Sequence, residues 1–142
     1  MAYNPFTLKG KTILVTGASS GIGRSIAVEC SKMGAKVCIT ARNDERLKQT
    51  LSMMKGDGHK AFIADLTDED AILAMVDDMP PLNGVVHNAG IGDRTLCKTV
   101  KNGDIETVMA ANFSGPVLLQ RQLMKKKRME SESSIVFIAS RA

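Results

Sequence analysis

The sequence has few of the features that mark secreted, membrane-spanning or metal-binding proteins. Its 142 residues include three cysteines and no tryptophan, and aromatic residues make up 4% of the chain. The cysteines, Cys30, Cys38 and Cys97, lack the spacing of metal ligands, and their odd number is typical of reduced thiols. The first residues contain no apolar core like that of a secretion signal, and no apolar run is long enough to cross a bilayer. We therefore expect a cytoplasmic protein with no metal site and no membrane contact.

The positive charge of the chain is small and mostly local. The formal net charge is +4, and the only dense basic run is KKKR at 125–128. This run follows an apolar helical pattern, where cations favour the negative end of the helix dipole. No aromatic residues are interleaved with it to stack on bases. We interpret the run as a solvated helix end and expect no nucleic-acid partner.

Five short apolar runs alternate with stretches of helical length and period. The runs are KTILVTG, KVCIT, KAFIADL, NGVVHNAG and SIVFIAS, which begin at residues 11, 36, 60, 83 and 134. Strands and helices in strict turn predict right-handed crossovers, and therefore an α/β fold with a doubly wound parallel sheet. The fifth run has the pattern of a strand buried on both faces. There are no repeats and no interdomain linker, so residues 1–142 should form one domain or part of one.

The stretches between the runs carry signals for helix ends and helix faces. Gly34 is expected to stop the first helix. The apolar stripe of that helix consists of Ile22, Ile26, Cys30 and Met33. Thr67 is expected to open the third helix, and the prolines at 80 and 81 to close it. Its apolar residues are Ile72, Leu73, Met75 and Val76.

The segment TGASSGIGR, residues 16–24, follows the first predicted strand. Gly17 allows the chain to turn sharply off the strand, and Gly21 and Gly23 would let a pyrophosphate approach the backbone. The helix that begins here directs its free N–H groups to the same place, and the two serine hydroxyls can add hydrogen bonds. A glycine-rich turn can be only a turn, but its position in a βαβ pattern favours a dinucleotide site.

The end of the second predicted strand bears on the choice of cofactor. A dinucleotide fold that prefers NAD usually has an acidic residue there, which contacts the ribose and would repel a 2′-phosphate. Here Ala41 occupies the expected acidic position, and Arg42 follows it as a planar cation suited to a phosphate. The alternative is an exposed arginine that opens a helix away from the cofactor. We favour NADP(H) over NAD(H).

Asn112 shares a predicted helical stripe with apolar residues. Pro116, four residues later, has no N–H, so the Asn112 carbonyl should lose its helical hydrogen bond and the helix should kink. A polar residue on the buried side needs a partner, and the released carbonyl is free to hold a water. The alternative is a satisfied core asparagine beside an incidental kink. The apolar residues of the stripe are Ile105, Val108, Met109, Pro116, Leu119 and Leu123.

With TGASSGIG at 16–23, HNAG at 87–90, Asn112 and Ser140 in this order, the sequence resembles the short-chain dehydrogenase/reductase family, specifically its compact single-domain branch. The resemblance extends from Thr16 to Ser140. His87 stands where the family has the first asparagine of NNAG, and we expect it to perturb strand-end hydrogen bonds more than chemistry. The resemblance implies a Rossmann-type sheet of five strands here, in the order 3-2-1-4-5.

The resemblance also implies roles for individual residues. In the family, a serine polarises the carbonyl, an asparagine backbone holds a relay water, and a tyrosine with a nearby lysine gives the proton. Ser140 and Asn112 match the first two catalytic positions, although Ser140 could instead cap the next turn. The single tyrosine, Tyr3, precedes the first strand, so the Tyr-x-x-x-Lys pair is absent. The implied cofactor-binding residues are Gly17, Ser19, Ser20, Gly21, Ile22, Gly23, Arg42, Asp65, Leu66, Asn88, Ala89 and Gly90.

We therefore expect an NADP(H)-dependent oxidoreductase that reduces a ketone, on a small-molecule or acyl-carrier-bound substrate, with 3-oxoacyl-acyl-carrier-protein reduction as the leading possibility. One alternative is a non-catalytic dinucleotide-binding regulator. Another is an extended-branch epimerase or dehydratase, whose glycine spacing usually differs. We expect residues 1–142 to be the N-terminal part of a longer single domain, because one face of strands four and five would be bare. We expect them to be inactive alone, because the Tyr-x-x-x-Lys pair is absent. The resemblance implies a homo-oligomer at full length.

Overall fold

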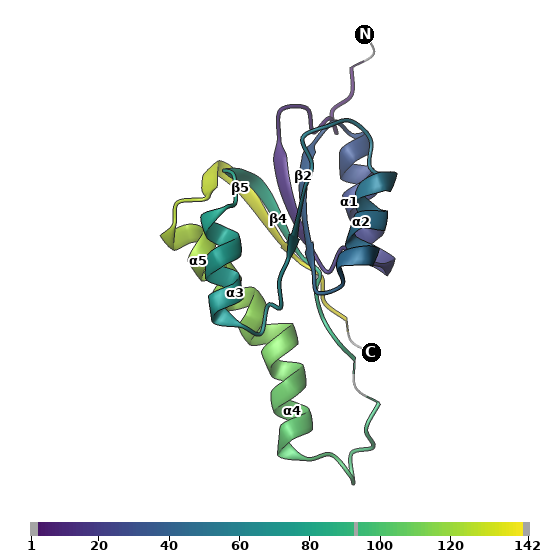
Figure 1. Ribbon diagram of the computed structural model, residues 1–142, viewed down its shortest axis with the longest axis vertical. Coiled ribbons are helices and arrows are strands. Elements are labelled where there is room, and N and C mark those ends of the chain that lie inside the picture. The colour runs from purple at the N-terminus through teal and green to yellow at the C-terminus, as the bar shows by residue number, and fades with distance from the viewer. Residues whose placement is uncertain (1–2, 93, 141–142) are drawn as a thin grey trace.

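The computed structural model describes residues 3–92 and 94–140, which form a parallel sheet with helices on both faces (Figure 1). The strands are β1 (Thr12–Thr16), β2 (Lys36–Ala41), β3 (Lys60–Ile63), β4 (Leu82–His87) and β5 (Met129–Phe137). Every strand pair is parallel, and the order is β3-β2-β1-β4-β5. The α/β fold and the strand order expected from the sequence are confirmed.

The helices lie in two layers, one on each face of the sheet. In Figure 1, α1 (Gly21–Lys32) and α2 (Asp44–Met53) lie on one face, while α3 (Glu69–Asp77) and α5 (Gly115–Lys125) lie on the other. The chain reaches α5 through α4 (Asn102–Met109) and η1 (Ala110–Ser114), a π-helical turn. Figure 1 shows α4 projecting beyond the end of the sheet, and none of its residues is buried.

The core has two parts because successive strand residues point to opposite faces. On the α3 and α5 side, Leu14 and Val85 pack with helix residues such as Leu119. On the α1 and α2 side, Val15 and Ile39 pack with others such as Leu47. Complete burial of a side chain of this size stabilises the fold by about 1.5–3 kcal/mol relative to exposure. The sheet is therefore held from both sides at β1, its central strand.

The expected stripe of α1 is only partly confirmed. Ile26 and Cys30 are partly buried and pack against the core, whereas Ile22 is 64% exposed. The face that packs inward consists mostly of small residues: Gly23, Ala27, Val28 and Ser31. Small side chains allow the helix to lie close to the sheet. The pattern of large apolar residues does not identify this inward face. Gly34 does follow the helix end, with a φ of 95°.

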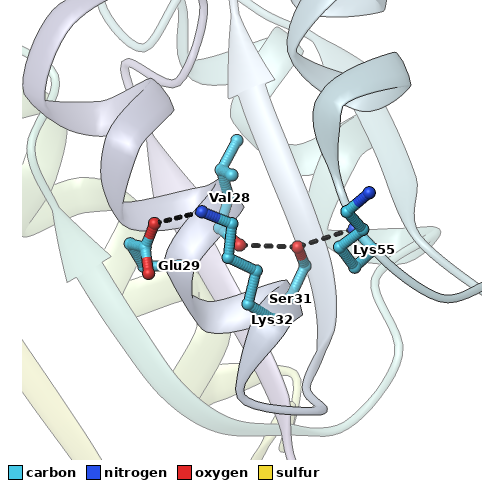
Figure 2. A network of polar contacts seen from close by, with 5 residues as sticks. All are labelled: Val28, Glu29, Ser31, Lys32 and Lys55. Atoms are coloured by element: carbon cyan, nitrogen blue, oxygen red, sulfur yellow. Dashed lines mark hydrogen bonds and ion pairs between the residues drawn. The ribbon is translucent and has the colours of Figure 1, made fainter.

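Ser31 is a buried polar residue that ties α1 to the end of α2. Its hydroxyl donates to the Val28 carbonyl at 2.6 Å and accepts the Lys55 backbone N–H at 2.9 Å (Figure 2). On the outer side of the same helix, Lys32 and Glu29 form an exposed ion pair at 2.6 Å. Since Ser31 is 3% exposed and both of its bonds are internal, it links the two helices at the end remote from Gly21.

The third helix begins one residue later than expected. Asp68 is its N-cap and accepts the backbone N–H groups of Asp70 and Ala71, while Thr67 bonds to Asp65 instead. Its other end is bound by the basic run after α5. Arg128 donates to the carbonyls of the last residues of α3, at 3.2 and 2.8 Å, and Lys126 forms an ion pair there at 2.9 Å.

The fifth strand departs from its expected burial. It begins at Met129 rather than at residue 134. Its pairing register with β4 shifts between Leu82 and Gly84. Residues 135–138 are exposed, Phe137 by 55%. Within the described residues β5 pairs only with β4, and an edge strand with little over its faces leaves its side chains in solvent. The bare surface expected on the last two strands is present on β5, but not on β4, whose residues are all buried or half-buried. The expected burial of the fifth strand on both faces is wrong.

None of the helices in the described ranges is long and apolar enough to cross a membrane.

Candidate cofactor cleft

A cleft of about 1080 Å³ opens where β1 to β4 end. In an open α/β sheet the helices leave a crevice at the carboxyl ends of the strands, where the strand order reverses, and here that point is between β1 and β4. All the predicted cofactor-binding residues except Gly23 line the cleft: Gly17, Ser19, Ser20, Gly21, Ile22, Arg42, Asp65, Leu66, Asn88, Ala89 and Gly90. Segments far apart in the sequence are thus brought to one surface.

The glycines after β1 serve different purposes. Gly17 has a φ of 65°, and a Cβ there would lie 2.8 Å from the Ala89 Cα. A Cβ on Gly23 would overlap the Gly17 carbonyl and lie 2.5 Å from the Asn88 amide nitrogen. Gly23 is buried and outside the cleft, so its expected role in admitting a pyrophosphate is replaced by internal packing of the turn. Gly21 faces open space with a φ of 53°.

Thr16 is a residue of this site that the sequence reading missed. Its hydroxyl oxygen accepts the backbone N–H groups of Asn88 at 3.0 Å and Ala89 at 2.9 Å. The Asn88 side-chain amide returns a hydrogen bond to the Thr16 carbonyl at 3.2 Å. These bonds fix the segment after β4 against the end of β1. A polar residue at the end of an otherwise apolar strand was the available signal.

The first turn of α1 faces the cleft with no side-chain cap. Ser20 is the N-cap residue, but its side chain makes no capping hydrogen bond. The first N–H groups of a helix lack partners within it and carry a partial positive charge. With Ser19, Ser20 and Gly21 lining the cleft, this helix end suits an anionic group such as a pyrophosphate.

Two cations and one carboxylate line the cleft in the segments that follow β2 and β3. Arg42 and Arg46 both line it, beside Asn43, the residue that caps α2. Hydrogen bonds from the Thr67 hydroxyl at 2.7 Å and its N–H at 2.9 Å lower the pKa of Asp65, and the charge of Arg42 lowers it further. Asp65 is therefore an ionised acceptor. Arg42 is exposed and lines the cleft.

His87 makes its own hydrogen bond inside the protein. It is 3% exposed, its Nε2 lies 2.9 Å from the Gln120 side-chain oxygen, and its ring stacks on Phe137 with centroids 4.5 Å apart. Burial lowers the pKa of His87, and the Gln120 hydrogen bond opposes that effect only in part. A neutral imidazole thus connects β4 to α5 and β5, immediately before the residues that line the cleft.

Asn112 lies in η1 and is exposed, so its expected place on the buried side is wrong. The π-helical turn changes which face points inward: Pro116 and Leu119 are buried, but Ile105 is half exposed. The expected interruption of the regular helix before Pro116 is present. The Asn112 side chain has the partner that was expected, because it accepts the Ile91 N–H at 2.7 Å and donates to the Ile91 carbonyl at 2.8 Å.

Ser140 follows β5 on the same sheet edge as the cleft but does not line it. The strand end is held by a hydrogen bond from the Ile138 N–H to the His87 carbonyl at 3.0 Å. Asn112 does not line the cleft either and reaches it through Ile91. Tyr3 is 90% exposed in the segment before β1. Among the described residues, no three His, Cys, Asp or Glu side chains are grouped to hold a metal ion.

Comparison with known proteins gives a family match over nearly the whole chain. The model of the short chain dehydrogenase family matches residues 11–142. The 3-oxoacyl-acyl-carrier-protein reductase FabG of Rickettsia felis is 35% identical over 133 residues, which cover 94% of this chain and 55% of that protein. The gluconate 5-dehydrogenase of Gluconobacter oxydans is 33% identical, with 95% and 55% covered. The chain thus spans about half the length of these relatives.

Solved structures share the fold closely. A citronellol catabolism dehydrogenase, AtuB, of Pseudomonas aeruginosa PAO1 superposes with a TM-score of 0.88 at 28% identity, over 98% of this chain and 59% of that one. A structure from Escherichia coli CFT073, described as a short chain dehydrogenase complexed with NADPH, has a TM-score of 0.86 at 31% identity, over 97% and 62%.

Proposed function

This chain belongs to the short-chain dehydrogenase family, and from that premise we propose that it forms the cofactor-binding part of an NADP(H)-dependent oxidoreductase that reduces a ketone to an alcohol. The observation that carries the proposal is the cleft, whose lining includes one helix N-terminus and two arginines, Arg42 and Arg46. A nicotinamide dinucleotide phosphate carries a pyrophosphate, which suits the helix N-terminus, and a 2′-phosphate, which suits the arginines. Binding of NADPH by a structural neighbour supports the same choice.

The residues of the cleft fit the parts of such a cofactor. The uncapped first turn of α1 would hold the pyrophosphate, and Arg42 and Arg46 would hold the 2′-phosphate. Asp65 and Leu66 would contact the adenine, with Asp65 as an ionised acceptor for its amino group. When bound, the nicotinamide supplies a hydride.

We propose Ser140 as the residue that polarises the substrate carbonyl and the Asn112 backbone as a holder of a relay water. Ser140 lies beyond the end of β5, on the edge of the sheet where the cleft opens. Pro116 offers no N–H to the Asn112 carbonyl, and η1 interrupts the helix at that point. The match to a 3-oxoacyl-acyl-carrier-protein reductase supports an acyl-carrier-bound substrate.

We further propose that these residues are the N-terminal part of a longer single domain, which is cytoplasmic, and that residues 1–142 alone bind the cofactor without turnover. The sequence has one tyrosine, and no lysine stands four residues after it, so a proton donor of the family's kind is not in this chain. The exposed apolar surface of residues 135–138 supports a covering layer contributed by further chain.

We propose pairing of two copies through the long helical segment of α4, η1 and α5. Large apolar side chains recur along it at intervals that keep them near one face, and each is about half exposed or more. They are Ile105, Met109, Phe113, Val117 and Met124. Gel filtration of a Phe113→Asp variant tests the pairing, since a charge on this face should give the monomer.

The cofactor proposal is tested by titrating the protein with NADPH and NADH. Loss of a charged hydrogen bond to the 2′-phosphate costs about 1.5–3 kcal/mol, so Arg42→Ala should weaken NADPH binding by about 10- to 100-fold and leave NADH binding unchanged. Lys48→Ala removes a cation from α2, the helix that follows Arg42, at a position outside the cleft, and should change neither affinity. Equal affinities for NADPH and NADH in the parent protein would contradict the NADP(H) assignment.

A further inference from the structure

Arg24 lies in the first turn of α1, and its guanidinium group contacts three acceptors. It donates to the Ser19 carbonyl, to the Thr50 hydroxyl at 3.0 Å and to the Arg46 carbonyl at 3.3 Å. The side chain is partly buried and does not line the cleft. Its hydrogen bonds are therefore made within the protein, and neighbouring residues, not Arg24, line the cleft.

The three acceptors belong to two different segments. Ser19 is in the turn that leads into α1, whereas Arg46 and Thr50 are in α2. A second bond joins the same segments, because the Thr50 hydroxyl donates to the Ala18 carbonyl at 2.7 Å. Arg24 and Thr50 together bind the turn at residues 17–20 to α2.

Both segments contribute residues to the cleft. Ser19 and Ser20 line it from the turn, and Arg42 and Arg46 line it from the stretch that leads into α2 and from α2 itself. The Arg46 backbone N–H is itself bonded to the Asn43 side chain at 2.9 Å, so a bond to the Arg46 carbonyl acts on the start of α2. The Arg24 contacts therefore join the two segments that carry the proposed sites for the two anionic groups.

We propose that Arg24 is a positioning residue, which fixes the distance between the pyrophosphate turn and the 2′-phosphate arginines so that a dinucleotide phosphate meets both at once. This inference rests on the proposed function. Guanidinium is suited to the task because its five N–H donors lie in one plane and can serve acceptors in several directions. A ligand that contacts both segments gains affinity when they are held in place before it binds.

The chain offers a matched control at the opposite end of the same helix pair. Ser31 joins α1 to Lys55 through a buried hydroxyl, as shown in Figure 2, and neither residue lines the cleft. Ser31→Ala should loosen the two helices away from the cleft. A comparison of the two positions therefore separates loss of positioning from general loss of helix packing.

The test uses two ligands, NADPH, which contacts both segments, and adenosine 2′-monophosphate, which contacts only the arginines. Arg24→Gln should weaken NADPH binding by about tenfold and adenosine 2′-monophosphate binding by less than about twofold. Arg24→Lys keeps the charge but has no planar group, and should resemble the glutamine variant. Ser31→Ala should lower the melting temperature and change neither affinity.

Three results would overturn the proposal. Unchanged NADPH affinity in Arg24→Gln would show that the spacing does not depend on this side chain. Equal losses for the two ligands would show a direct contact with the phosphate. Full recovery of NADPH binding in Arg24→Lys would show that charge alone matters.

Hydrogen exchange without ligand distinguishes failure of this proposal from failure of the proposed function. Arg24→Gln should speed exchange of the amides at residues 18–24, among them Ala18, which is bonded to the Thr40 carbonyl. Ser31→Ala should instead speed exchange at Lys55, whose N–H is bonded to Ser31. A parent protein that binds neither ligand would refute the proposed function, and unchanged exchange at residues 18–24 would refute the role of Arg24.

Discussion

Replacement of Thr16 by valine removes one buried oxygen atom at the end of β1, beneath the residues that line the cofactor cleft, and keeps the shape of the side chain. In the structure that oxygen accepts two backbone N–H groups, at 3.0 Å from Asn88 and 2.9 Å from Ala89. A buried donor that loses its partner costs about 1–3 kcal/mol. Asn88 and Ala89 are only partly buried, so the lower end applies to each, and we expect a total loss of about 2 kcal/mol.

Urea denaturation of the parent, Thr16→Val and Thr16→Ser measures this cost. Serine keeps the oxygen and loses one methyl group, which is worth about 0.8 kcal/mol. A loss of about 2 kcal/mol lowers the melting temperature of a protein of this size by about 5–10 °C. Thr16→Val should also weaken NADPH binding more than Thr16→Ser, because the displaced segment after β4 lines the cleft. If valine were as stable as serine at this position, the reasoning from unpaired N–H groups would be refuted.

Two further predictions concern the turn after β1 and the buried histidine. Gly23→Ala would force a Cβ against the Gly17 carbonyl and should lower the free energy of unfolding by about 3 kcal/mol or more. Gly21 faces open space with a φ of 53°, so Gly21→Ala should lower it by only about 1 kcal/mol. Denaturation of the two variants measures both values. Burial lowers the pKa of His87 below its ordinary 6.5, so the unfolded chain takes up a proton first as the pH falls. Stability should decrease below about pH 6.5, by at most about 1.4 kcal/mol per pH unit, and His87→Asn should lose that part of the pH dependence in melting curves. A pH profile identical in the two proteins would contradict the buried neutral imidazole.

The residues that line the cleft could be predicted, because local backbone conformation and position directly after a strand identify them. Gly17 has a positive φ at the end of a strand, and Arg42 follows an apolar run of strand length. Both positions follow from where a strand stops, and the carboxyl ends of parallel strands meet at one edge of a sheet. The roles of Thr16 and Arg24 could not be predicted in the same way. Their partners, such as Asn88 and Thr50, are brought close only when the strands and helices pack.

The faces of helices and strands were predicted less well than their existence. Ile22 fits a helical stripe, yet the smaller residues of α1 pack inward, because the short distance between helix and sheet leaves room only for small side chains. Asn112 fits the stripe of a regular helix, but η1 changes the angular position of every residue before it relative to Pro116. Phe137 fits a buried strand, but its burial depends on neighbours at the edge of the sheet.

The sequence by itself determined the alternation of strands and helices, the glycine-rich turn and the basic residue after β2, because each of these depends on local periodicity or on one residue's conformational freedom. Only the tertiary structure decided which apolar residues are covered, that Thr16 holds the segment after β4, and that Arg24 joins two segments that line the cleft. Burial and long-range hydrogen bonds depend on distances between segments remote in the chain, which packing sets and local pattern does not contain.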